Sequence, residues 1–172
     1  IPGSLFIGLE GMFAPWAGTL IENVKQKIII ISTKGKEEEA ITRLARVGFD
    51  NVLGFLDGGY DNWVKSSGKI KKIKSISAEK FVNEIRASEK NIYDVRSMEE
   101  FKIGHFPGAK NTPLKNIDKH IPELKKNSPF YIYCKAGYRS VVASSFINRV
   151  NDLKLINVKG GYDSIEKLIF ST

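Results

Sequence analysis

The chain carries one stretch of sequence twice, and this internal repeat constrains the fold more than any other feature. The tetrapeptide Gly-Gly-Tyr-Asp occurs at 58–61 and again at 160–163, an offset of 102 residues. In both places it follows a short apolar run, at 52–56 and at 155–158. Self-similarity of this kind predicts two copies of one structural unit.

The repeat continues upstream and indicates the fold class. At the same offset, the apolar run at 28–32 aligns with a run at 130–134. Residues 141–150, which follow the second run, have the apolar spacing of a one-sided helix. Strands that alternate with helices through short connections predict an α/β fold, in which each copy is a mostly parallel sheet flanked by helices.

The second copy is the more complete of the two. A predicted helix at 78–87 and a predicted strand at 91–95 precede its repeat, whereas no sequence before Ile1 can supply their counterparts. We therefore expect the first sheet to lack a strand and a helix that the second has. We also expect this chain to be the tail of a longer protein, because sheet edges and apolar faces would otherwise stay uncovered.

Composition and charge divide the chain into two predicted domains, 1–68 and 77–172, joined by a linker. The 172 residues are 42% hydrophobic, enough for a core in each domain. The net charge of +8 includes the lysine-rich stretch at 69–76, which has the composition of a solvated linker. Basic groups are not interleaved with aromatic residues, so we expect no nucleic-acid partner and instead a field that attracts small anions.

The chain has a single cysteine, Cys134, at the junction of the 130–133 run and a loop at 134–140. In an open α/β sheet, a turn from strand to helix lies where ligands bind, and the helix N-terminus would stabilise a thiolate there. The alternative is a buried structural cysteine. Gly137 and the cations Lys135 and Arg139 favour a reactive thiol over that alternative.

Residues 75–172 carry ordered motifs, among them Asp94-Val-Arg-Ser97, the loop Cys134-Lys-Ala-Gly-Tyr-Arg-Ser140 and Gly160-Gly161. Together these motifs resemble those of the rhodanese-like sulfurtransferases. The first copy resembles the same fold but has no thiol in the corresponding loop, where Ser32 replaces the cysteine, so we expect it to be inactive. The residues that carry the resemblance are Asp94-Val-Arg-Ser97, Glu100-Phe, Gly104-His-Phe-Pro-Gly-Ala109, Asn111-Thr-Pro-Leu114, the loop Cys134-Lys-Ala-Gly-Tyr-Arg-Ser140, and Gly160-Gly161.

The resemblance implies an enzyme of the thiosulfate sulfurtransferase type. Cys134 would attack the sulfane sulfur of thiosulfate or of a small persulfide, hold it as a persulfide, and pass it to a thiol acceptor. A substrate-binding role is implied for the remaining loop residues: Lys135, Ala136, Gly137, Tyr138, Arg139 and Ser140. Their backbone N–H groups can converge on the terminal sulfur.

Several residues around the loop have two interpretations. Arg139 either binds the anionic donor or forms a structural pair with an acid such as Glu100. We expect Asp94 and Arg96 to brace the loop by hydrogen bonds, with a proton-accepting Asp94 the weaker alternative. His105 is interpreted as a hydrogen-bonded structural residue.

Two other functions compete with sulfur transfer. One is a non-catalytic sulfur carrier or regulatory module. The other is an oxyanion enzyme such as a cysteine phosphatase or arsenate reductase, which the loop disfavours because only four residues separate Cys134 from Arg139.

The tandem arrangement is similar to the C-terminal portion of persulfide dioxygenase fusions that have a metallo-β-lactamase-fold domain upstream. With His105 and His120 the only histidines, we expect no metal site and no cofactor in this chain. A lone cysteine and the lack of a long apolar segment predict a cytoplasmic protein without a membrane partner.

Overall fold

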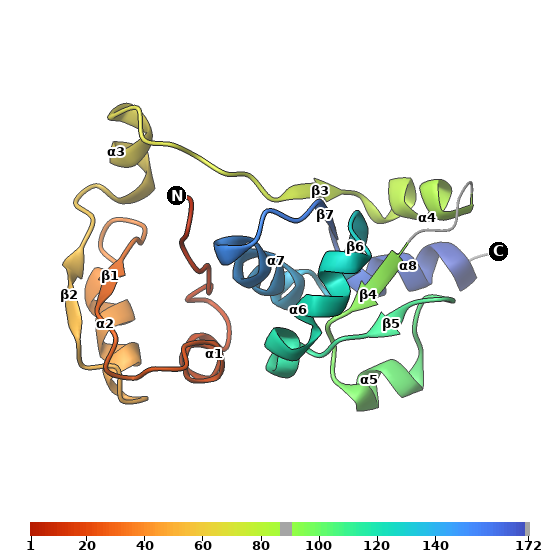
Figure 1. Ribbon diagram of the computed structural model, residues 1–172, viewed down its shortest axis with the longest axis horizontal. Helices are drawn as coiled ribbons and strands as arrows, with labels where there is room; N and C mark the ends of the chain where they lie inside the picture. The colour runs from red at the N-terminus through yellow and green to blue at the C-terminus, as the bar shows by residue number, and fades with distance from the viewer. Residues whose placement is uncertain (87–90, 171–172) are drawn as a thin grey trace. The chain divides into compact units, whose positions relative to one another are not determined.

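The computed structural model describes residues 1–86 and 91–170 of the chain. These residues form two compact units, Ile1–Lys71 and Lys72–Thr172, which are called unit 1 and unit 2 below. Figure 1 shows the order of the elements along the chain. The last residue of the predicted helix at 78–87 and the last two of the predicted domain at 77–172 lie outside the described part.

Unit 1 is a two-stranded parallel sheet with three helices. Ile29 of the first strand lies opposite Gly54 of the second. The elements, in chain order, are α1 (Phe13–Leu20), β1 (Ile28–Ile30), α2 (Glu37–Ala45), β2 (Val52–Phe55) and α3 (Gly59–Lys65).

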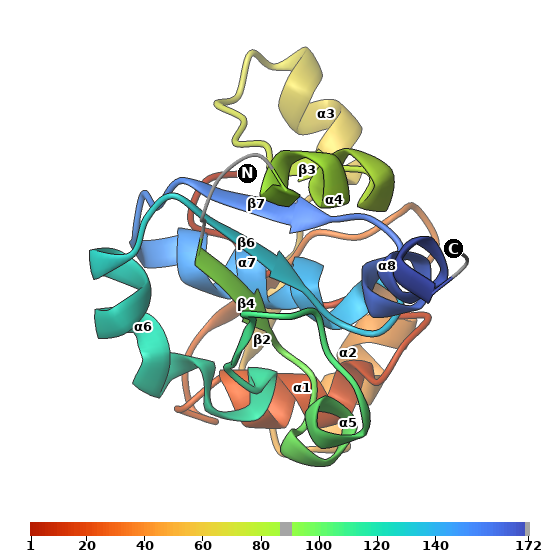
Figure 2. The same ribbon diagram turned by 90° about the vertical axis from the view of Figure 1, so that its right-hand side faces the viewer.

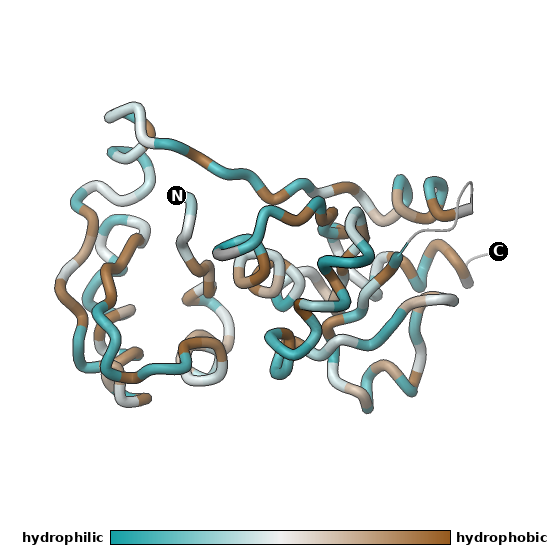
Figure 3. Tube along the Cα trace, viewed as in Figure 1, coloured by the Kyte–Doolittle hydropathy of each residue, from teal (hydrophilic) through white to brown (hydrophobic). Residues whose placement is uncertain are grey.

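The core of unit 1 lies between its sheet and the helices α1 and α2. Ile30 of β1 is buried there with Phe13, Ala17, Ala40, Leu44 and Phe49. Both strands are largely hydrophobic (Figure 3), yet Ile29 is 65% exposed and Leu53 is 58% exposed. The small sheet therefore keeps apolar side chains that its own helices do not cover.

Unit 2 is a five-stranded sheet in which every pairing is parallel, with the strand order β3-β7-β6-β4-β5. Figure 2 shows β7, β6 and β4 side by side at its centre. The elements are β3 (Lys74–Ile76), α4 (Ala78–Arg86), β4 (Asn91–Asp94), α5 (Met98–Ile103), β5 (Lys110–Asn111), the 3-10 turn η1 (Leu114–Asn116), α6 (Ile117–Lys126), β6 (Phe130–Tyr133), α7 (Tyr138–Val150), β7 (Leu155–Val158) and α8 (Gly161–Phe170).

Helices cover both faces of this sheet, so all four residues of β6 are buried. Because successive side chains of a strand point to opposite faces, Tyr131 and Tyr133 share one face. They pack there with Phe81 of α4 and Ile165 of α8. The opposite face is covered by α7, and α6 packs beside α7. The carboxyl ends of β4, β6 and β7 consequently meet at one edge, between two layers of helices.

The structure agrees with the predicted α/β fold and parallel sheets, with some boundaries moved. The strand predicted at 130–133 is found as expected, whereas α7 begins at Tyr138, three residues before the predicted start. The strand expected at 28–32 ends at Ile30, and the strand expected at 91–95 ends at Asp94.

One boundary predicted for the organisation of the chain is wrong, and one predicted difference is too small. The linker assigned to 69–76 includes β3, which pairs with β7 at the edge of the larger sheet. The first sheet is expected to lack a strand that the second has, and the observed difference is larger. Within the described residues it has two strands against five, because β3, β4 and β5 all lack counterparts.

No helix in the described part of the chain is both long enough and apolar enough to cross a membrane.

Candidate active site

Cys134 directly follows β6, and the loop after it leads into α7. Its residue exposure is only 1%. The backbone N–H of Gly137 points back across the loop and donates to the Cys134 Sγ at 3.1 Å. The sulfur therefore lies inside the turn, within hydrogen-bond distance of a backbone donor.

Gly137 makes the turn between the strand and α7. Its φ of +109° lies in a region that side-chain-bearing residues rarely adopt. Its carbonyl oxygen accepts from the Oγ of the buried Ser140 at 3.0 Å. Because the first N–H groups of a helix have no acceptor within the helix, the start of α7 directs donors into the loop. Lys135 and Ala136, in contrast, are exposed on the outside of the turn.

Arg139 is held by Glu100 through a two-pronged ion pair. Its Nη1 lies 2.5 Å from Oε2, and its Nη2 lies 2.7 Å from Oε1. Of the two interpretations of Arg139, the structure therefore shows the pair with Glu100. The pKa of Arg139 is raised first by Glu100, and then to a smaller extent by Cys134. The guanidinium thus lies within electrostatic reach of the sulfur.

Glu100 is fixed at the start of α5 by a capping box. The Ser97 hydroxyl accepts from the Glu100 N–H at 3.2 Å, and Glu100 Oε2 accepts from the Ser97 N–H at 3.2 Å. The hydrogen bonds from Arg139 lower the pKa of Glu100 from 4.5 to about 2. Glu100 is therefore charged near neutral pH.

Asp94 and Arg96 form a buried ion pair at the end of β4. Arg96 Nη2 lies 2.7 Å from Asp94 Oδ2 and also donates to the Gly104 carbonyl oxygen at 2.6 Å. These two side chains are expected from the sequence to form hydrogen bonds with the loop at 134–140. Among the residues that the structure describes, no such hydrogen bond is found. The pair instead fixes the 104–106 segment, which reaches Tyr133 of β6 through the N–H of Phe106.

The pair Gly160-Gly161 supports the loop from the neighbouring strand, a role that the sequence did not reveal. A Cβ added to Gly161 would lie 2.2 Å from the Cys134 carbonyl oxygen and 2.5 Å from that of Lys135. The same two oxygens accept from the first turn of α8, from the N–H of Tyr162 at 2.7 Å and of Asp163 at 3.0 Å. The start of α8 thus holds both carbonyl groups of the loop by hydrogen bonds.

Unit 1 repeats this close approach without the thiol. A Cβ on Gly59 would lie 2.3 Å from the carbonyl oxygen of Ser32, the residue that aligns with Cys134. Gly59 and Gly161 have nearly the same φ, +56° and +57°. The repeated tetrapeptide therefore makes the same backbone contact between two loops in both copies.

The tyrosine of the tetrapeptide distinguishes the two copies. Tyr162 is buried, and its ring lies 4.1 Å from the Arg96 guanidinium carbon, so it links α8 to the Asp94–Arg96 pair. Its counterpart in unit 1, Tyr60, is 47% exposed.

Two further residues that the sequence singled out lie beside the site. His105 Nδ1 is 2.9 Å from the Phe101 carbonyl oxygen, and its ring stacks on the Phe101 ring. This agrees with a structural role. Tyr138, the first residue of α7, is partly buried at the edge of the loop.

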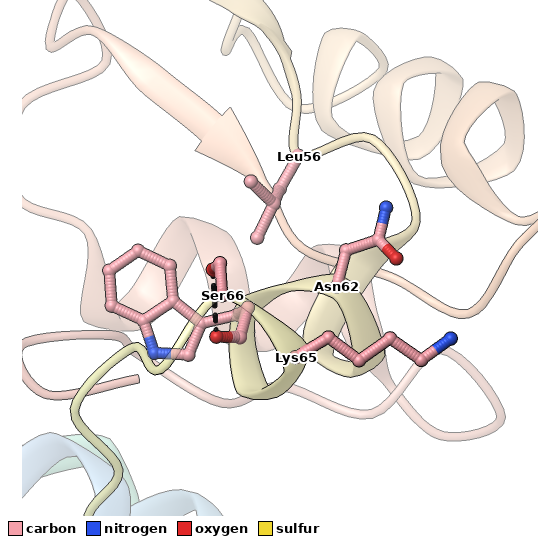
Figure 4. A pocket seen from close by; sticks show the side chains of 5 residues that line it. Leu56, Asn62, Lys65 and Ser66 are labelled. Atoms are coloured by element: carbon pink, nitrogen blue, oxygen red, sulfur yellow. Dashed lines mark hydrogen bonds between the residues drawn. The ribbon is translucent and has the colours of Figure 1, made fainter.

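Unit 1 has a pocket of its own, between the end of β2 and α3 (Figure 4). Its lining includes Leu56 and Trp63. Their counterparts in unit 2, Val158 and Ile165, are fully buried in the core beside α4. The pocket is therefore best explained as an uncovered apolar face, because the equivalent face of unit 2 is packed.

A metal centre is not indicated. No group of three or more His, Cys, Asp or Glu residues in the described ranges is arranged to hold an ion.

Comparison with protein families gives one match that spans most of the chain. The family described as Rhodanese-like domain matches residues 1–66 and 77–168. The two matched segments correspond to the two copies of the internal repeat.

Individual relatives cover a smaller part. The Bacillus subtilis protein YrkF, named as a candidate sulfur carrier, is 37% identical over 97 residues, which are 56% of this chain and 52% of that protein. YqhL from the same organism is 31% identical over 90 residues, 52% of this chain and 70% of that protein. This chain thus spans about half the length of YrkF.

A solved structure supports the same fold. The crystal structure of a rhodanese-like domain protein from Staphylococcus aureus is 32% identical with a TM-score of 0.50, and the match covers 54% of this chain and 91% of that one.

Proposed function

Because the chain belongs to the rhodanese-like domain family, we propose that it transfers sulfane sulfur through a persulfide on Cys134. The observation that carries the proposal is the position of the Cys134 Sγ inside a turn whose own N–H donates to it. A persulfide at this position would place its charge near the donors at the start of α7.

The reaction follows from a thiolate that is both nucleophile and leaving group. In the first step, the Cys134 thiolate attacks the sulfane sulfur of thiosulfate; the sulfur–sulfur bond of the donor breaks, and sulfite leaves with the electron pair. In the second step, a thiolate acceptor attacks the outer sulfur of the Cys134 persulfide and regenerates the Cys134 thiolate. The acceptor leaves as a persulfide, and no net oxidation occurs.

The residues of the loop take different parts in this scheme. Gly137 and the first turn of α7 would bind the transferred sulfur through their N–H groups, and the exposed Lys135 would attract an anionic donor. Arg139, in its pair with Glu100, would act on the bound donor, whereas Lys135 would act on a donor that is still approaching. Asp94 and Arg96 would act indirectly, by holding the segment between β4 and β5.

Steady-state kinetics test this proposal. We expect parallel lines in double-reciprocal plots for a sulfane donor and a thiol acceptor, as in a ping-pong scheme, and complete loss of turnover in the Cys134→Ser variant. Turnover that survives in this variant would refute the assignment, and would direct attention to Ser32 in unit 1.

A sulfur carrier is the second candidate function. It is favoured by the burial of Cys134 and by the naming of YrkF as a candidate carrier. A carrier would take up one sulfur atom per chain but would release it only to a specific protein partner, so single-turnover loading without turnover on small thiols would support this alternative. An oxyanion-processing enzyme is less well supported, because the loop between Cys134 and Arg139 is short.

We further propose that the chain works within a longer protein, as in the fusions with a metallo-β-lactamase-fold domain to which its sequence is similar. The exposed Ile29 and Leu53 support an additional segment that covers unit 1. In unit 2 the counterpart of Ile29, Tyr131, is buried against Phe81 of α4, and β3 pairs with the edge of β7. The mass of the natural polypeptide tests this proposal, and a natural product that begins at Ile1 would overturn it. We expect this protein to act in the cytoplasm, where reductants keep a lone thiol available.

A further inference from the structure

The charges beside Cys134 are largely compensated. The Arg139 guanidinium is paired with Glu100, and the Arg96 guanidinium is paired with Asp94. Lys135 is the one loop cation for which the described residues supply no ion-pair partner. The two cations of the loop therefore differ, because Arg139 is compensated by Glu100 whereas Lys135, within the described residues, is not.

This balance bears on which donors the site can use. Thiosulfate carries two negative charges and must approach a thiolate that carries a third. The repulsion disfavours attack unless nearby cations offset it. A donor with one negative charge fewer suffers less from the same repulsion. A site with one uncompensated cation consequently suits a monoanionic donor better than a dianionic one.

We propose that Glu100 is a specificity-determining residue that, by neutralising Arg139, sets the site to prefer sulfane donors of low charge, such as small-molecule persulfides, over thiosulfate. This inference rests on the proposed sulfur transfer. The ion pair is geometrically definite, since both carboxylate oxygens accept from the guanidinium. Glu100 is also locked at the start of α5 by Ser97, so it cannot readily turn away from Arg139.

Two sulfane donors of similar chemistry but different charge can test this proposal. Thiosulfate and methanethiosulfonate present the same sulfane sulfur, but a methyl group replaces one charged oxygen in the second. With thiosulfate, the Cys134 thiolate takes the outer sulfur and sulfite leaves; with methanethiosulfonate, methanesulfinate leaves. In both reactions one sulfur–sulfur bond forms and one breaks, so the ratio of the two kcat/KM values isolates the effect of the donor's charge.

The test variant is Glu100→Gln. Glutamine at this position of a capping box can still accept from the Ser97 N–H, so α5 keeps its cap while Arg139 loses its counter-charge. We expect the ratio of kcat/KM for thiosulfate to that for methanethiosulfonate to rise by roughly threefold to thirtyfold, the range of a partly exposed charge interaction. Added salt should reduce the change.

Glu99→Gln is the matched control. Glu99 lies in the same first turn of α5 and is exposed, with no hydrogen bond to Arg139 among those described. Its removal changes the net charge of the chain by the same amount, so we expect the donor ratio to stay within about twofold of wild type.

The double variant Glu100→Gln/Arg139→Gln removes both members of the pair. If compensation of charge is the cause, the double variant should return the donor ratio to near the wild-type value, whatever it does to the absolute rates. This result does not depend on a single variant keeping full activity.

The outcomes distinguish the inference from the function on which it rests. A wild-type chain that takes sulfur from neither donor onto Cys134 would refute the proposed function. A chain that takes sulfur from both, but whose donor ratio is unchanged or lower in Glu100→Gln, would leave sulfur transfer standing and refute the role of Glu100. A ratio that also rises in Glu99→Gln would show a general effect of net charge, and would refute that role too.

Discussion

Replacing Gly161 with alanine should damage the active-site loop from outside it. The new Cβ would lie 2.2 Å from the Cys134 carbonyl oxygen and 2.5 Å from the Lys135 carbonyl oxygen, both of them backbone atoms. A normal contact requires one of the two segments to move by about 1 Å, since real Cβ atoms are not found within 3.0 Å of such atoms. The φ of +57° adds a conformational strain of about 1–2 kcal/mol for alanine.

The displacement also affects the hydrogen bonds that tie the loop to α8. The N–H groups of Tyr162 and Asp163 donate to the same two oxygens, and each bond contributes about 0.5–1.5 kcal/mol. With the strain included, we expect Gly161→Ala to lower the free energy of unfolding by about 2–5 kcal/mol. A shift of about 1 Å at the nucleophile should also reduce kcat/KM by about a hundredfold in molecules that remain folded.

Unit 1 supplies a matched control. Gly59→Ala has the same φ strain and a similar collision, 2.3 Å from the Ser32 carbonyl oxygen, but in the copy without a thiol. Gly160→Ala is a second control, because its φ of +75° brings a similar strain while its Cβ would meet the Ser164 side chain instead of the backbone of the loop. Chemical denaturation and sulfur-transfer rates should be measured for all three. Equal losses of activity for Gly59→Ala and Gly161→Ala would refute the reasoning.

Two predictions concern the cap and the ion pair at α5. Because the folded pKa of Glu100, about 2, lies below its ordinary 4.5, the pair with Arg139 stabilises the fold above about pH 4.5 and less as the pH falls toward 2. In chemical denaturation, the difference in unfolding free energy between wild type and Glu100→Gln should therefore be smaller at about pH 3 than at about pH 6. An unchanged difference would contradict the pKa shift. Ser97→Ala removes one side of a complete capping box and should lower the free energy of unfolding by about 1 kcal/mol. The loss should exceed that of Ser77→Ala at α4, where the Ser77 hydroxyl accepts a single hydrogen bond from the Lys80 N–H at 3.2 Å. Equal losses in chemical denaturation would argue against the capping box.

The sequence predicts the centre of unit 2 well because its signals there are local. The run at 130–133 is apolar throughout, as expected for a strand covered on both faces, and it is buried at every position. The same run predicts that Cys134 begins a turn toward a helix. Helix α7 starts before the apolar spacing at 141–150 begins, because its first turn is formed by residues of the loop and not by core residues.

The errors come from features that depend on contacts distant in sequence. β3 is three residues at the edge of the sheet and follows a lysine-rich stretch, so composition favoured a linker. Only its pairing with β7 makes it a strand. The choice of Glu100 as the partner of Arg139 was likewise open, because 39 residues separate them and only the fold brings them together.

The role of Gly161 depends on a contact that the sequence signal indicates only in part. The repeated tetrapeptide indicated duplication, and a pair of glycines indicated an unusual backbone. Which atoms approach the missing side chain becomes clear only from the position of α8 beside the loop. The same reasoning applied to unit 1 would have linked Gly59 to Ser32.

The central claim is that Cys134 carries the transferred sulfur, and intact-protein mass spectrometry tests it most directly. The chain should be incubated with thiosulfate or methanethiosulfonate and then separated from the donor in the absence of reductant. Its intact mass should be measured, and peptide mapping should locate any added sulfur. We predict a mass increase of one sulfur atom per chain, located on Cys134, absent from Cys134→Ser, and removed by an acceptor thiol. A chain that gains no sulfur from either donor, or gains it at a residue other than Cys134, would contradict the account.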